Sequence, residues 1–277
     1  EGLEWHGEST IDNAITFTEI HLLARAYKQT RRPEILDSIN RAIDYLYLSQ
    51  YPNGGWPQRY PIADNYGHDI TLNDDAMVNV MHLLKEIDEN KEGAYDFVNP
   101  ARRAKARPAF DKGLACLLKL QIKVNGKLTA WAQQYDPETL EPAKARAYEL
   151  PGLSGNESAS VVLLMMELDN PSPEVQRAVH AAVAWFEASK IKGIRTQRTA
   201  DDVIVVEDPN ADPLWARYYE IDTNRPFFCG RDGIKKYSLA EIERERRRGY
   251  AWLRPWGAPV LNKYPAWAEK YPPVAQN

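Results

Sequence analysis

Acidic and amide side chains recur where helical patterns begin, and their oxygens could bind a metal ion. The three acid-x-Ala triplets are Asp12-Asn13-Ala14, Asp74-Asp75-Ala76 and Glu157-Ser158-Ala159. If the first two occupy equivalent places in a repeat, their oxygens converge from separate elements, which is the ligand set that a hard cation requires. The competing interpretation is ordinary helix capping, because Asp and Asn are favoured N-caps.

Basic side chains interleaved with aromatic residues form a second group that could bind a ligand or take part in catalysis. The cations that could meet an acidic ligand locally are Lys144, Arg146, Arg217, Arg225, Arg231, Lys235 and Lys236. Guanidinium groups bind planar carboxylates in a bidentate manner, while neighbouring rings stack on sugar faces. The alternatives are a surface ion pair between Arg146 and Glu149 and, for the other arginines, a plain structural network.

Composition and motifs exclude several other functions. The formal net charge of -4 argues against a general nucleic-acid binder, and no apolar stretch is long enough to cross a membrane. The sequence contains no GxSxG, P-loop or HExxH motif, and its two cysteines, Cys116 and Cys229, lack a zinc-ligand spacing. Hydrolysis by paired carboxylates stays open, with the candidates Asp74, Asp75, Asp136 and Glu157.

The elements that must position these groups form a threefold repeat. Each triplet precedes a helical pattern, as in Met77, Val80, Met81 and Leu84, which follow helical spacing. A second helix is predicted in each unit, over Glu34–Ser49, Arg102–Gln121 and Glu174–Ser189. A loop of the form Trp-x-(Gln or Arg)-x-Tyr follows, starting at Trp56, Trp131 and Trp215. The plain interpretation of this loop is aromatic packing.

Three such units cannot each bury a core alone, so they are expected to pack together. We predict an all-α fold, an (α/α)3 toroid or incomplete barrel, with short β-hairpins in its loops. Residues 194–199 and 202–207, rich in β-branched side chains, predict one such hairpin. Residues 1–277 form a single domain in this interpretation, with an irregular C-terminal wrap from about Tyr250.

Several blocks of the chain, from about Asp12 to Trp252, resemble the pectate lyases of polysaccharide lyase family 10. The blocks are Asn53-Gly54-Gly55-Trp56-Pro57-Gln58, Asn73-Asp74-Asp75-Ala76-Met77, Trp131-Ala132-Gln133-Gln134-Tyr135-Asp136, Ala145-Arg146-Ala147-Tyr148-Glu149-Leu150-Pro151, Leu153-Ser154-Gly155 and Thr223-Asn224-Arg225-Pro226-Phe227-Phe228 through Gly233. The resemblance implies the toroid fold, Ca²⁺ as cofactor and polygalacturonate as substrate.

The resemblance also implies roles for particular residues. It places Asp12, Asn13 and Asp74 at the calcium site and Arg146 at the position of the catalytic base. The residues expected to bind substrate are Arg231, Arg225, Arg217 and Lys144. Lys144 departs from the family pattern, in which a tryptophan is expected at that position.

The implied reaction is anti β-elimination, which leaves 4,5-unsaturated oligogalacturonides. The C5 proton lies α to a carboxylate, and a neutral arginine would remove it, which predicts an alkaline optimum. Substrate size predicts a secreted or periplasmic protein, and we expect a monomer. The alternatives are an (α/α) toroid glycoside hydrolase with paired carboxylates and a non-catalytic uronide-binding protein.

Overall fold

The computed structural model describes residues 9–62 and 64–273, in two compact units. Unit 1 comprises residues up to Lys119 together with Tyr135–Glu141, and unit 2 comprises Leu120–Gln134 together with residues from Pro142 onward. About 49% of the described structure is helical and about 15% is strand. The fold is therefore mixed α/β, and the prediction of an all-α toroid is wrong.

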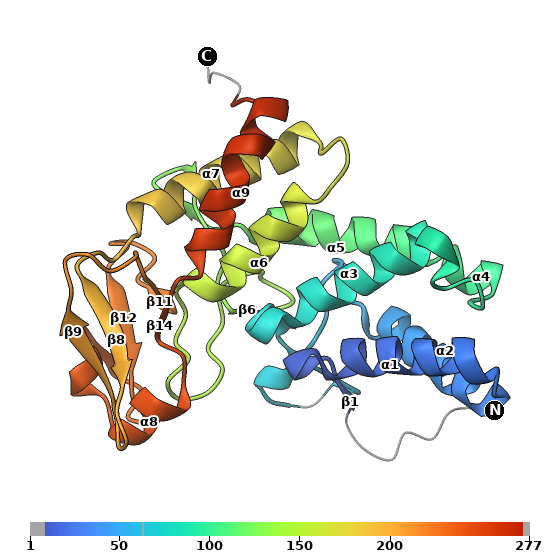
Figure 1. Ribbon diagram of the computed structural model, residues 1–277, viewed down its shortest axis with the longest axis horizontal. Coiled ribbons are helices and arrows are strands. Elements are labelled where there is room, and N and C mark those ends of the chain that lie inside the picture. The colour runs from blue at the N-terminus through green and yellow to red at the C-terminus, as the bar shows by residue number, and fades with distance from the viewer. Residues whose placement is uncertain (1–8, 63, 274–277) are drawn as a thin grey trace. The chain divides into compact units, whose positions relative to one another are not determined.

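Helices make up most of unit 1. They are α1 (Ile15–Thr30), α2 (Pro33–Ser49), α3 (Ala76–Glu89), α4 (Pro100–Arg103) and α5 (Ala106–Leu120). Helix α1 packs against α2 and α3, as Figure 1 shows. The helical periodicity after the first two triplets is thus confirmed, because its apolar positions, such as Met77 and Met81, are fully buried.

Short strands accompany these helices in unit 1. Strand β1 (Ser9–Thr10) pairs antiparallel with β2 (Arg59–Tyr60), and β3 (Ile70–Thr71) precedes the turn that opens α3. Strand β6 (Gln134–Tyr135) spans the boundary between the two units. Strands β2 and β6 belong to the first two Trp loops, whose alternating aromatic and polar residues suit an extended backbone. This is one physical reason why the all-α prediction failed.

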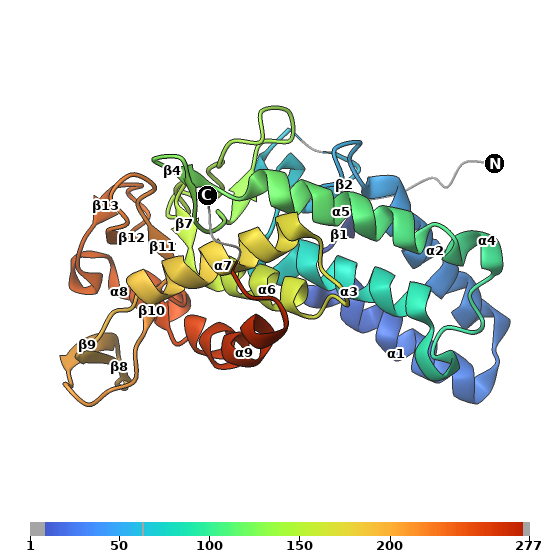
Figure 2. The same cartoon turned by 90° about the horizontal axis from the view of Figure 1, so that it is seen from above.

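Unit 2 packs three long helices together. They are α6 (Gly155–Met166), α7 (Pro173–Ala188) and α9 (Gly257–Lys270). A short helix, α8 (Arg244–Gly249), contacts strand β9 (Val203–Glu207). Figures 1 and 2 both show α9 lying along α6 and α7. Helix α6 is buried on nearly every side, as its continuous apolar sequence predicts. Within the described residues, no helix is both long and apolar enough to span a membrane.

The predicted irregular C-terminal wrap is wrong over most of its length. Strand β14 (Leu253–Arg254) and α9 occupy this segment, and residues 274–277 lie outside the described part. Two prolines obscured the helix in the sequence, although Val260 and Trp267 keep helical spacing and are buried. The ring of His180 on α7 contacts the ring of Trp267, so tertiary packing stabilises a helix that contains Pro265.

The strands of unit 2 form small antiparallel sheets. The largest has the order β13 (Lys235–Lys236), β12 (Pro226–Cys229), β11 (Tyr218–Tyr219) and β7 (Leu153–Ser154). The other pairs are β10 (Trp215–Ala216) with β14, β4 (Lys123–Val124) with β5 (Lys127–Leu128), and β8 (Ile194–Arg198) with β9 (Val203–Glu207). The last pair confirms the predicted hairpin.

The tryptophans of the three loops are core anchors. Trp56, Trp131 and Trp215 are all buried. The indole Nε1 of Trp56 donates to the carbonyl of Leu46 on α2 at 2.8 Å, and that of Trp215 donates to Phe186 on α7 at 2.9 Å. Each of these two loops is therefore attached to the helix that precedes it. The aromatic-packing interpretation of the Trp loops is confirmed.

Candidate functional site

Two turns in unit 1 carry the predicted metal ligands. Asp12–Ala14 forms a 3-10 turn before α1, and Asn73–Asp75 forms another before α3. The second and third residues of both turns have left-handed φ angles, 52° and 56° in the first and 47° and 64° in the second. The repeat therefore aligns Asn13 with Asp74, one residue away from the predicted alignment of Asp12 with Asp74.

The side chain of Asn73 joins the two turns. Its Nδ2 donates to Oδ1 of Asp12 at 3.3 Å and to Oδ2 of Asp74 at 3.2 Å. Asn73 is buried, whereas both carboxylates are partly exposed and Asn13 is exposed beside them. The cap residues of these turns and of α1 and α3 make no capping hydrogen bond through their side chains. Ala14 and Asp75 occupy the N-cap positions of α1 and α3, and Oδ1 of Asp12 accepts from the backbone N–H of Asn13 at 2.9 Å.

This group, which we call the oxygen cluster, consists of Asp12, Asn13, Asn73 and Asp74. It offers carboxylate and amide oxygens, which are the donors that Ca²⁺ prefers in proteins. Among the residues described, no group of three or more His, Cys, Asp or Glu side chains could hold a metal ion. Two carboxylates leave coordination positions for water or for a ligand, so the donor set fits a hard cation and a carboxylate ligand together. Sequence reasoning missed Asn73, although it directly precedes Asp74.

Arg146, in unit 2, makes a bidentate contact with Glu149. The Nε of Arg146 donates to Oε2 of Glu149 at 2.6 Å, and its Nη2 donates to Oε1. The side chain of Glu149 is 2% exposed and that of Arg146 is 41% exposed. No acceptor among the described residues is assigned to Nη1 of Arg146, so this nitrogen is available to a ligand. The ion pair with Glu149, which was the alternative interpretation of Arg146, is present, although Glu149 is buried and the pair is not a surface one.

The contact shifts the pKa of both partners. Hydrogen bonding to Glu149 raises the pKa of Arg146, although burial acts in the opposite direction. Burial is the largest effect on Glu149 and would raise its pKa, but the hydrogen bonds and charge of Arg146, together with the hydrogen bond from Tyr250, hold that pKa below its ordinary value. The isolated pair therefore stabilises the charged form of Arg146.

Four guanidinium groups gather around two tyrosine rings. Arg146, Arg231 and Arg246 lie 5.1, 6.0 and 4.6 Å from the ring centre of Tyr148, and Arg146 and Arg217 lie 5.8 and 4.8 Å from that of Tyr250. We call these four arginines the arginine cluster. Cation–π attraction to the rings holds like charges closer together than water alone would allow. Such a concentration of guanidinium groups suits a ligand with several carboxylates.

The members of the cluster differ in exposure. Arg217 is 4% exposed, and its Nη2 donates to Oε1 of the buried Glu157 at 2.6 Å. Arg231 is exposed and pairs with Glu245, which also pairs with Arg246. Arg217 therefore stabilises the interior of the cluster, and Arg231 lies where a ligand has access. Glu157, the acid of the third triplet, lies inside α6 and not in a turn of the kind that forms the oxygen cluster.

Sequence reasoning missed Arg246 and placed Arg225 and Lys144 less well. Arg246 lies in the charge run Arg244–Arg248, which is typical of a solvated helix, and its burial and its contact with Tyr148 distinguish it from the rest of the run. The guanidinium of Arg225 lies 3.4 Å from the ring centre of Tyr237, and no contact joins it to the rings of the cluster among the residues described. Lys144 is exposed.

Hydrogen bonds from Tyr250 and Gln133 orient Glu149. The hydroxyl of Tyr218 donates to Oε1 of Gln133 and lies 2.7 Å from that of Tyr250. The hydroxyl of Tyr250 donates to Oε1 of Glu149 at 2.9 Å, and Nε2 of Gln133 donates to the same oxygen at 3.3 Å. Gln133 and Tyr218 come from the second and third Trp loops. These loops therefore control the orientation of Arg146 through Glu149.

Unit 1 thus offers oxygen ligands for a hard cation, and unit 2 offers guanidinium groups and rings for a polymer that carries carboxylates.

Comparison with known proteins identifies the family. The family model described as pectic acid lyase matches residues 3–261. A family 10 polysaccharide lyase from Cellvibrio cellulosa is 35% identical, with a TM-score of 0.87 over 95% of this chain and 81% of that chain. A mutant of such an enzyme in complex with trigalacturonic acid is 34% identical, with a TM-score of 0.87 over 96% of this chain and 82% of that chain. No curated protein matches. The chain belongs to the pectic acid lyase family and is a polysaccharide lyase of family 10.

Proposed function

We propose that this enzyme is a calcium-dependent pectate lyase that cleaves polygalacturonate by β-elimination, with Arg146 as the base. The observation that carries the proposal is the geometry of Arg146. Its Nε and Nη2 are bonded to the buried Glu149, and its Nη1 is left for a ligand within a cluster of four guanidinium groups. Family membership supplies the reaction class.

The residues of the chain divide into three roles in this scheme. Asp12, Asn13 and Asp74 would hold Ca²⁺, with Asn73 fixing the two carboxylates. When bound, the cation would offset negative charge on a uronate carboxylate and so make the neighbouring C5 proton more acidic. Arg231 would bind a substrate carboxylate. The oligosaccharide held by the Cellvibrio cellulosa relative supports this substrate class.

The bond changes in the proposed reaction balance without a further reactant. Arg146 accepts the C5 proton at Nη1, and the electrons of the C5–H bond form the C4–C5 double bond. The C4–O bond breaks, and the departing oxygen takes a proton from water. The hydroxide that remains then takes the proton from Arg146, which restores the neutral base. The products are a 4,5-unsaturated uronide and a shortened chain.

Two opposing effects act on the neutral form of Arg146 that this reaction needs. The charge of Arg146 acts to lower the pKa of Arg246, and this repulsion is mutual. The contact with Glu149 acts in the opposite direction. We therefore propose an alkaline optimum, where the neutral fraction of Arg146 is larger. We also propose that the protein is secreted or periplasmic, because the polymer is too large to enter a cell. We expect it to be a monomer.

The test is elimination activity followed as the ultraviolet absorbance of the unsaturated product. Replacing Arg146 with alanine or lysine is expected to lower kcat by about 10²- to 10⁴-fold, the range for loss of a general base. Arg177→Ala on α7 is the control, because Arg177 is exposed and pairs only with Glu174 among described residues. Near-normal elimination by both Arg146 variants would refute the assignment of the base. Saturated products without absorbance would instead indicate hydrolysis.

A further inference from the structure

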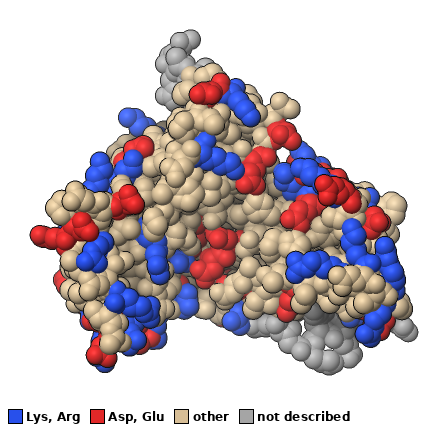
Figure 3. All heavy atoms as spheres, in the orientation of Figure 1, with Lys and Arg blue, Asp and Glu red and all other residues tan. Residues whose placement is uncertain are grey.

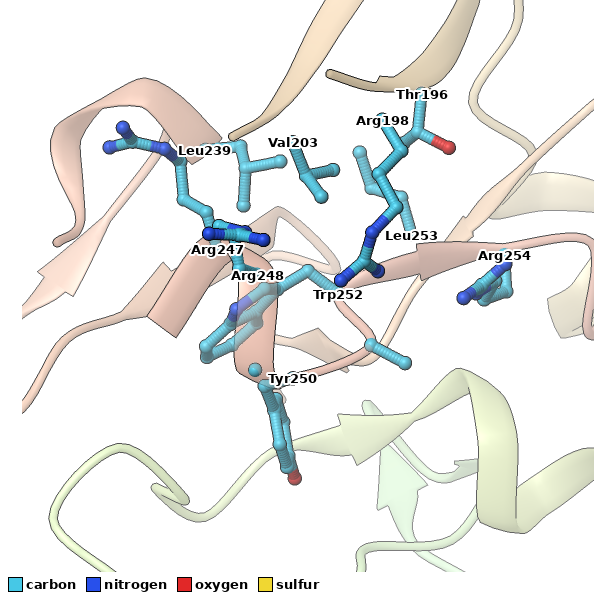
Figure 4. Close-up of a pocket in the computed structure, with 12 residues that line it drawn as sticks. Thr196, Arg198, Val203, Leu239, Arg247, Arg248, Tyr250, Trp252, Leu253 and Arg254 are labelled. Carbon is cyan, nitrogen blue, oxygen red and sulfur yellow. The ribbon is translucent and has the colours of Figure 1, made fainter. Parts of the chain in front are cut away.

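Unit 2 contains a second basic hollow, between the β8–β9 hairpin and the segment that follows α8. Its volume is about 360 Å³. We call it the hairpin pocket and define it by Arg198, Arg247, Arg248, Tyr250, Trp252 and Arg254 (Figure 4). Figure 3 shows Lys and Arg side chains gathered on the face that carries this hairpin and α8. None of the four arginines of the pocket belongs to the arginine cluster.

The pocket has more positive charge than its acidic neighbours neutralise. Arg247 is bound by Asp202, with 2.9 Å between Nε and Oδ1. For Arg198, Arg248 and Arg254, which are exposed, no side-chain acceptor is assigned among the described residues. Figure 4 shows the side chain of Arg198 running from β8 toward Trp252. Exposed guanidinium groups that line one pocket without an assigned side-chain acceptor favour an anionic ligand.

The remaining walls are apolar. Val203 from β9, Leu239 and Leu253 line the pocket beside the arginines. Ligand sites commonly combine apolar walls with a few polar groups and have volumes of about 300 to 1,000 Å³. The hairpin pocket lies at the lower end of that range, which suits one or two sugar rings that carry a carboxylate.

Tyr250 lies between the pocket and the arginine cluster. It lines the pocket, while Figure 4 shows its phenol pointing away from Arg198. On the side of the arginine cluster, the guanidinium of Arg146 lies 5.8 Å from the centre of the Tyr250 ring. Helix α8 likewise presents Arg246 to the cluster and Arg248 to the pocket. The pocket and the arginine cluster therefore share Tyr250 and α8 as neighbours.

We propose that the hairpin pocket is an accessory subsite that binds the carboxylate of a uronate unit away from the bond that is cleaved. The proposal rests on the proposed function for the identity of the polymer. It assigns Arg198 and Arg248 the role of carboxylate ligands, with Val203, Leu239 and Leu253 contacting the apolar faces of the sugar rings.

The direct test maps protection of arginines in the Arg146→Ala protein, which keeps the pocket intact and does not consume the ligand. Phenylglyoxal modification is followed by peptide mass spectrometry with and without hexagalacturonate. We expect the hexasaccharide to slow modification of Arg198 and Arg248 about threefold to tenfold, as expected for exposed charged contacts. Arg195, on the same strand but outside the pocket, is expected to react unchanged. Equal protection by sulfate at the same concentration would overturn the proposal, as would no protection.

Steady-state kinetics provide the second test. Arg198→Ala combined with Arg248→Ala is expected to raise KM for polygalacturonate about threefold to tenfold while kcat stays unchanged, because the lost contacts bind ground state and transition state alike. The control is Arg195→Ala, and equal thermal midpoints establish that each variant folds. An unchanged KM in the double variant would overturn the subsite. If the wild type formed no unsaturated product but arginine protection persisted, the lyase proposal would fail and the subsite would stand.

Discussion

Glu149 acts on Arg146 in two ways that have opposite effects on catalysis. It holds the guanidinium in one plane through two hydrogen bonds, which positions Nη1. The same hydrogen bonds raise the pKa of Arg146 and so disfavour the neutral form. The geometry of the pair thus favours proton transfer, whereas its electrostatics move that transfer to higher pH.

Glu149→Gln separates these two effects. It removes a negative charge beside Arg146 and keeps the shape of the side chain, so the pKa of Arg146 should fall. Because the neutral form then appears at lower pH, the rising alkaline limb of kcat/KM is expected to move to lower pH. The measurement is the pH profile of elimination, with Glu174→Gln as a control on the exposed end of α7. An unmoved or upward-shifted limb would show that Arg146 is not the titrating base.

Single residues also show where sequence reasoning ended. Asp12, Asn13, Asp74 and Arg146 were proposed from their sequence blocks, and in the structure Asn73 joins Asp12 to Asp74. Arg246 was not recognisable, because a charge run on a helix has the same composition whether or not one member turns inward. Only tertiary packing brings its guanidinium to Tyr148.

At the scale of elements, the paired 3-10 turns are expected to bind calcium in solution. In wild-type protein, calcium at a hundredfold excess over Kd should stabilise folding by about 2.7 kcal/mol. Asp12→Asn and Asp74→Asn each remove a carboxylate and should lose most of this gain, whereas Asp111→Asn, on the exposed face of α5, should keep it. Thermal unfolding with and without calcium measures the effect independently of activity. Equal calcium stabilisation in all four proteins would place the cation elsewhere.

The loop before the first Trp motif depends on a glycine packed against α5. Gly54 has φ of 98°, and a Cβ there would lie 2.1 Å from the carbonyl oxygen of Lys112. Gly54→Ala is therefore expected to lower the free energy of unfolding by more than about 3 kcal/mol, because the new Cβ would collide with the backbone of α5. Gly126→Ala is the control, because Gly126 also has positive φ, 78°, but nothing lies within 4 Å of its Cβ position.

Gly126→Ala should lower the free energy of unfolding by only about 1 to 2 kcal/mol, which is the cost of a left-handed backbone alone. Urea unfolding measures both values. Similar losses for the two glycines would mean that the loop can shift away from α5.

Helices were more predictable than strands for a physical reason. In long helices such as α2 and α7, the spacing of the apolar residues in the sequence shows which face is buried. Both helices begin and end within a residue of the predicted bounds. Strands β10 and β11 are two residues long and exist because the Trp loop pairs with β14, β7 and β12. Such pairing is nonlocal, so a local pattern could not predict it.

At the scale of the whole molecule, the chain passes between its two units three times, and α5 itself runs from one into the other. We therefore propose that residues 1–277 unfold as one domain. Calorimetry is expected to give a single transition whose van't Hoff enthalpy equals the calorimetric enthalpy. Two resolved transitions, or a van't Hoff enthalpy well below the calorimetric value, would mean that the units melt independently.

Tyr250 is the residue at which two proposed tasks of the enzyme meet. One side of it faces the guanidinium that is proposed to accept the proton, and the same residue lines the hollow proposed to hold a distant sugar. A substitution of Tyr250 is therefore expected to affect proton transfer and sugar binding at the same time. Engineering that aims to change chain-length preference alone should therefore leave Tyr250 intact and vary the far wall, at Arg198 and Val203.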